Sequence, residues 1–95
     1  KFDEYKHGVS ALIKTAQNPA DFLNRVAGYN RSFGIQIPVE LYRVALRVGS
    51  IGNYENTKHF LRASEGILGR KLNMDESRTL TRLGTLISRI PALRR

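Results

Sequence analysis

Residues 38–48 constrain the fold of this chain more than any other stretch of the sequence. A helix turns by about 100° per residue, so the apolar side chains here would cover well over half of its circumference. Only Glu40, Arg43 and Arg47 are polar, and they fall on one narrow strip. Because a helix that is apolar over most of its surface must be surrounded by other elements, we predict that this is a central helix. Pro38 suits its first position, where an N–H group would lack a helical partner.

Four further stretches have apolar side chains at the three- and four-residue steps of an amphipathic helix. They cover residues 2–17, 19–29, 54–68 and 74–90. We therefore expect an all-α fold, a compact orthogonal bundle of four to five short helices around the central apolar helix. Since 95 residues are enough for one hydrophobic core, we expect a single helical domain over 1–95, excised from a longer chain.

Several helix ends are marked by residues with capping preferences. Asn18 predicts the start of the second helix, and Asn53 predicts the start of the fourth. Gly49 predicts the end of the central helix. Asn73, with Glu76 three residues later, gives the pattern of a capping box at the start of the last helix. Such caps satisfy backbone groups that helix ends leave unpaired.

The segment 30–37 is predicted to be irregular. Gly28 and Asn30 readily adopt the left-handed conformation that ends a helix, so we place the end of the second helix near them. A short extended piece here would need a partner strand, and the rest of the sequence offers none. We interpret the segment as a loop that Phe33 and Ile35 anchor in the core.

The charge of the chain is strongly positive and unevenly distributed. The net charge is +8, and residues 38–95 carry eleven basic side chains against five acidic ones. Such a balance favours a polyanionic partner, which could be nucleic acid, an acidic protein or an anionic membrane surface. The positive field belongs mainly to the C-terminal part of the chain.

Two absences narrow the classes of function. The chain has no cysteine, which excludes disulfides, cysteine-ligated zinc and thiol catalysis, and fits the cytoplasm or another reducing compartment. No apolar run approaches the roughly 20 residues that a membrane span needs.

His7 and His59 are the only histidines, and no cluster with metal-ligand spacing surrounds them. We expect no catalysis, metal or cofactor; the enzyme alternative is a nuclease-like toxin that uses one histidine with arginines.

The last predicted helix carries the best candidate site. Arg78, Arg82 and Arg89 line up with Thr85, roughly opposite an apolar stripe formed by Leu80, Leu83 and Ile87. Arginine can pair bidentately with phosphate or carboxylate, so this face suits an anionic ligand. The alternative is a solvated helix face without a ligand.

Four more basic residues complete the predicted site. Arg70 and Lys71 extend the positive field before the last helix. Arg43 and Arg47 of the central helix would contribute if their strip is exposed. By contrast, the spacing of Lys58 and Arg62 predicts pairing with Glu55 and Glu65, which would make the fourth helix a poor reader of phosphates.

A helix-turn-helix is the one DNA-binding motif that the spacing suggests. With Leu41 as its first position, Ala45 and Gly49 supply the small residue and the turn glycine at positions five and nine. Positions fifteen and eighteen of the motif should be aliphatic, but they are Glu55 and Lys58. The five-residue connection also exceeds the usual turn of three to four residues. A looser helix–loop–helix is the better interpretation.

The sequence therefore favours a small basic helical domain that binds nucleic acid, with DNA preferred over RNA, mainly through phosphate contacts from the arginines. The alternative is a protein-interaction or assembly module, in which the same arginines meet an acidic partner or a second copy of the chain.

Overall fold

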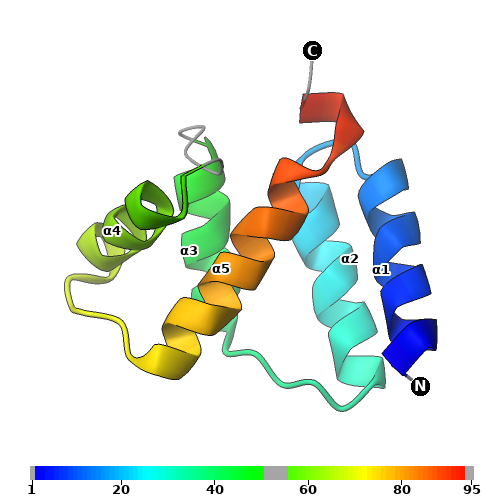
Figure 1. Ribbon diagram of the computed structural model, residues 1–95, viewed down its shortest axis with the longest axis horizontal. Coiled ribbons are helices and arrows are strands. Elements are labelled where there is room, and N and C mark those ends of the chain that lie inside the picture. The colour runs from blue at the N-terminus through cyan, green and yellow to red at the C-terminus, as the bar shows by residue number, and fades with distance from the viewer. Residues whose placement is uncertain (1, 51–55, 94–95) are drawn as a thin grey trace.

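The computed structural model describes residues 2–50 and 56–93. Its elements in chain order are α1 (Phe2–Thr15), α2 (Pro19–Ser32), α3 (Val39–Ser50), α4 (Thr57–Leu68), α5 (Met74–Ser88) and a 3-10 turn, η1 (Pro91–Leu93). This part of the chain contains no strand, which confirms the all-α prediction. Figure 1 shows α1 beside α2 at one end of the bundle, α4 at the other end, and α5 crossing in front of α3.

Helix α3 is the central helix, as predicted. It packs against α2, α4 and α5, and its side chains Leu41, Val44, Ala45 and Val48 are buried. The cover of its apolar side chains is incomplete, however. Val39 remains 62% exposed, because no other described element covers that side of the helix.

Helix α5 has the two faces that its spacing predicts. Leu80, Leu83 and Ile87 are buried in the core. The buried Gly84 lies against the ring of Phe60 from α4, which lets the two helices approach closely. The helix ends at Ser88 rather than at residue 90, because Pro91 begins the turn η1 that follows.

The end of α2 differs from the prediction. The helix continues to Ser32, and the turn is made at Gly34, which has a positive φ of 73°. Asn30 does not end the helix, because its side chain is buried and hydrogen-bonded. It accepts a hydrogen bond from the hydroxyl of Tyr5 (2.5 Å) and donates one to that of Tyr42 (3.0 Å).

The loop after α2 is anchored by Phe33 at its beginning and by the partly buried Ile37 near its end. Phe33 packs against the rings of Tyr5 and Tyr29, with ring centroids 5.3 Å and 4.9 Å apart. Ile35, predicted as a second anchor, is instead exposed to solvent, because the loop runs along the outside of α2 and α3.

The caps confirm the predictions in part. The side chain of Asn18 accepts a hydrogen bond from the Asp21 N–H (2.8 Å), as expected for a helix start. Helix α4 is capped by Asn56 rather than by Asn53, which lies outside the described residues. Gly49 does not end α3, since the helix continues to Ser50.

Candidate nucleic-acid interface on helix α5

The exposed side of α5 carries three of the predicted arginines. Arg78, Arg82 and Arg89 are all exposed, and so is Thr85 between them. Arg89 is the C-cap residue and keeps helical backbone angles, so the face continues past the last helical residue. With a rise of about 1.5 Å per residue, the three arginines span roughly 16 Å. We call these four residues the α5 face.

Few carboxylates of the described residues pair with the arginines of the α5 face. Arg78 lies 4.0 Å from Asp75, but both side chains are largely exposed, so this pair is weak. Within residues 2–50 and 56–93, Arg82 and Arg89 form no ion pair. Their guanidinium groups are therefore available to an external anion.

Arg82 lies beside a polar and aromatic cluster formed by α1 and α2. Burial raises the pKa of Tyr5, the neighbouring phenols of Tyr42 and Tyr29 raise it further, and the positive charge of Arg82 opposes the rise. The rings of Tyr5 and Tyr29 stack with centroids 5.5 Å apart. The hydroxyl of Tyr29 donates to the carbonyl oxygen of Glu4 (3.1 Å). These tyrosines therefore pack against the core.

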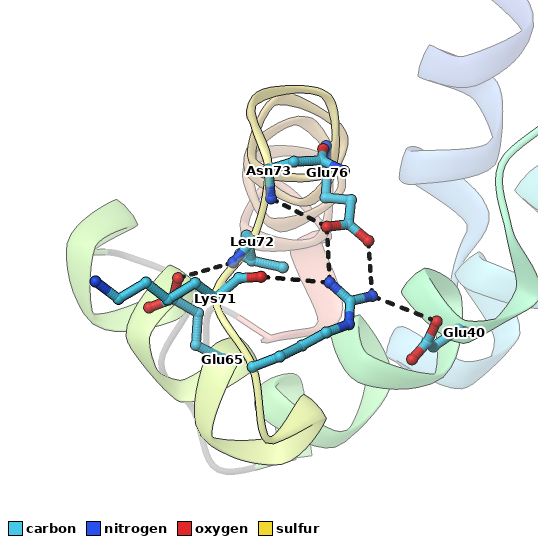
Figure 2. A network of polar contacts seen from close by, with 7 residues as sticks. Glu40, Glu65, Lys71, Leu72, Asn73 and Glu76 are labelled. Atoms are coloured by element: carbon cyan, nitrogen blue, oxygen red, sulfur yellow. Dashed lines mark hydrogen bonds and ion pairs between the residues drawn. The ribbon is translucent and has the colours of Figure 1, made fainter.

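Arg70 pairs with two carboxylates of the protein itself. Its guanidinium group donates hydrogen bonds to both carboxylate oxygens of Glu76, at 2.9 and 2.8 Å, and dashed lines mark these bonds at the labelled Glu76 in Figure 2. The same group lies 3.6 Å from the carboxylate of Glu40 on α3. Arg70 therefore ties the connection between α4 and α5 to the central helix, and an anion would have to displace these carboxylates to bind it.

Glu76 is the other half of this network. It accepts a hydrogen bond from the Asn73 N–H (3.0 Å) and donates its own N–H to the Asn73 side chain (2.9 Å), which confirms the capping box. The hydrogen bonds from Arg70 and from the Asn73 backbone lower the pKa of Glu76 to about 2. The carboxylate is therefore ionised at any physiological pH.

The basic side chains of α4 are paired with fewer carboxylates than the sequence predicts. Glu65 does not pair with Lys58 or Arg62; its carboxylate accepts a hydrogen bond from the Leu72 N–H instead (2.9 Å). Figure 2 shows Glu65 reaching this backbone group in the connection between α4 and α5. Lys58 and Arg62 are exposed, and Glu55 lies outside the described residues.

The remaining predicted site residues lie apart from the α5 face. Lys71 is exposed on the connection beside Arg70, where its carbonyl accepts a hydrogen bond from that guanidinium (3.3 Å). Arg43 and Arg47 are exposed on α3. Arg43 lines a groove between α2 and α3, and no residue of α5 lines that groove. The seven predicted residues therefore do not form one continuous site.

The helix-turn-helix pattern is also incomplete in space. Leu41 and Ala45 are buried as the motif requires. Lys58, at the position where the second helix should bury an aliphatic side chain, is exposed. Helix α4 therefore does not pack as the recognition helix of that motif.

The two histidines lie on different helices. His7 and His59 are exposed on α1 and α4, and no group of three His, Cys, Asp or Glu residues among the described ones could hold a metal ion. None of the described helices is long and apolar enough to cross a membrane.

Comparisons of the chain with protein-family models, with curated proteins and with solved structures found no match. Any functional proposal therefore depends on the geometry and charge of the surface.

Proposed function

We propose that this protein binds nucleic acid, DNA in preference to RNA, mainly by holding phosphate groups with the α5 face. The observation that carries the proposal is the placement of Arg78, Arg82 and Arg89 on one exposed side of a helix whose opposite side is buried. Two of these guanidinium groups have no ion pair among the described residues. The net charge of +8 adds a general attraction to the polyanion.

The α5 face suits phosphate contacts because its backbone is held in place. Leu80, Leu83 and Ile87 fix the helix in the core, so binding would order only the arginine side chains. Each guanidinium group can pair bidentately with a phosphate, and the Thr85 hydroxyl can donate one hydrogen bond between them.

The preference for DNA follows from the shape of the element. An exposed helix can lie along or enter the major groove of B-form DNA. In A-form RNA the corresponding groove is too deep and narrow for side chains to read.

The test is a salt titration of binding to a short labelled DNA duplex, followed by fluorescence anisotropy. Each phosphate contact contributes about −0.9 to the slope of log affinity against log salt, so three contacts give a slope of roughly −3. We expect Arg82→Ala to lower the magnitude of the slope by about one. Arg25→Ala, on α2, is the matched control and should leave the slope unchanged, because Arg25 pairs with Asp21 away from the α5 face.

Absence of binding to both DNA and RNA at about 50 mM salt would contradict the proposal. The arginines would then be better explained by an acidic protein partner or a second copy of the chain.

A further inference from the structure

A groove of about 620 Å³ opens between α2 and α3. Its walls come only from these two helices and from the loop that connects them. Most of the lining residues are apolar, among them Ala27 on α2, Ile35 in the loop, and Val39 and Leu46 on α3. The volume falls within the range of about 300–1,000 Å³ that is typical of binding pockets.

Part of the apolar lining of the groove packs against the core, but two of its large apolar side chains are exposed. Val39 is 62% exposed and Ile35 is 37% exposed, which is unusual for large apolar side chains beside one another. The apolar residues of α3 extend around most of the helix, but the fully buried ones lie on one side of it: Leu41, Val44, Ala45 and Val48. The groove is where the missing cover would lie.

The charge around the groove is positive. Arg31 and Arg43 line it, and no carboxylate does. Of the nearest acids, Asp21 pairs with Arg25 on another side of α2 (3.6 Å), and Glu40 lies 3.6 Å from Arg70. An occupant with carboxylates beside its apolar side chains would therefore match both the apolar walls and the two arginines.

We propose that this groove binds an amphipathic helix of a partner protein, with apolar anchors on one side of that helix and carboxylates at its edges. Two neighbouring helices with an apolar furrow between them form the usual receptor for a helix that presents anchors at three- and four-residue steps. A second copy of this chain is a poorer occupant, because each copy carries a net charge of +8 and the two would repel. The site is separate from the α5 face, so this inference does not depend on the proposed function.

The test uses a synthetic helical peptide as the probe, with leucines at three- and four-residue steps and glutamates at the other positions. A control peptide keeps the leucines and replaces every glutamate with lysine. We expect the acidic peptide to bind the protein and the basic one not to bind. Val39→Asp and Arg43→Glu should each weaken binding by about tenfold or more. Both side chains are exposed, so the variants should fold, which circular dichroism would verify.

Arg89→Glu changes the same charge on the α5 face and is the matched control, which should leave peptide binding within about twofold. Equal binding of the two peptides, or no effect of Arg43→Glu, would overturn the charge argument. No binding of either peptide would overturn the proposal as a whole. A dimer of the protein alone that Val39→Asp dissociates, measured by sedimentation equilibrium, would replace the acidic helix with a second copy as the occupant.

Discussion

Gly8 on α1 leaves room for the side chain of Tyr29 from α2. A Cβ atom at this position would lie 1.9 Å from the hydroxyl oxygen of Tyr29. Alanine would therefore push Tyr29 away from its stack on Tyr5 and from its hydrogen bond to Glu4. We predict that Gly8→Ala lowers the free energy of unfolding by about 1–3 kcal/mol, measured by urea denaturation.

The control for this prediction is Gly66 in α4, where an added Cβ would meet nothing within 4 Å. Gly66→Ala should stabilise the protein by about 0.5–1 kcal/mol, because alanine has the higher helix propensity. If Gly8→Ala stabilises to the same extent, the close approach of Tyr29 does not determine the choice of glycine.

Glu76 makes the stability of the protein depend on pH. Its pKa is about 2 in the folded protein and near 4.3 in an unfolded chain. The stabilisation by its charge is therefore fully present above about pH 5 and is lost as the pH falls toward 2. We predict that Glu76→Gln is less stable than the natural protein at neutral pH, and that urea denaturation shows the difference shrinking below about pH 4.

Asp75→Asn is the matched control for Glu76, since it removes the neighbouring negative charge. The Asp75 carboxylate is exposed and meets Arg78 only at 4.0 Å. Its loss should therefore cost less at neutral pH than the loss of Glu76. A Glu76→Gln variant with the natural stability at every pH would show that the contact with Arg70 does not stabilise the fold.

The two faces of helix α5 have different roles. The buried face stabilises the fold, and the exposed face is the one that we propose to bind the ligand. Leu83 is buried, so Leu83→Ala should leave a cavity and cost about 2–5 kcal/mol of stability. Arg82 is exposed, so Arg82→Ala should change stability by no more than about 0.5 kcal/mol. Thermal or urea unfolding of both variants measures the difference. A large loss for Arg82→Ala would make this arginine structural, through its charge beside Tyr5.

At the scale of the whole molecule, two separate surfaces lie on a thin body. The Cα atoms span 35 × 33 × 17 Å. The buried stripe of α3 joins the core that it shares with α5, whereas Val39 and Arg43 line the groove on another side of α3.

We predict that Arg43→Ala leaves the salt dependence of DNA binding unchanged, while Arg82→Ala reduces it. We also expect the acidic helical peptide not to displace DNA in a competition titration. Displacement of one by the other would mean that the two surfaces act as one site.

Features that depend on spacing along one helix could be predicted from the sequence. Residues three and four apart share a face in any helix, so the buried Leu80, Leu83 and Ile87 and the exposed arginines of α5 could be assigned without the structure. The central position of α3 followed from its unusually wide apolar surface. The capping box of Asn73 and Glu76 was also predictable, because these two residues lie within one helical turn of each other.

Which groups far apart in the sequence meet depends instead on how the helices pack, and the spacing along one helix does not reveal it. Asn30 has the local preferences of a helix end, but α2 continues past it to Ser32, and its buried amide is hydrogen-bonded to Tyr5 and Tyr42. The spacing of Glu65 suggests pairing with Arg62, yet the connection after α4 brings the Leu72 N–H to its carboxylate. Periodicity shows that a side chain belongs to an apolar face but contains no information about what covers that face. Whether Val39 lies in the core or in an open groove therefore depends on how the helices pack.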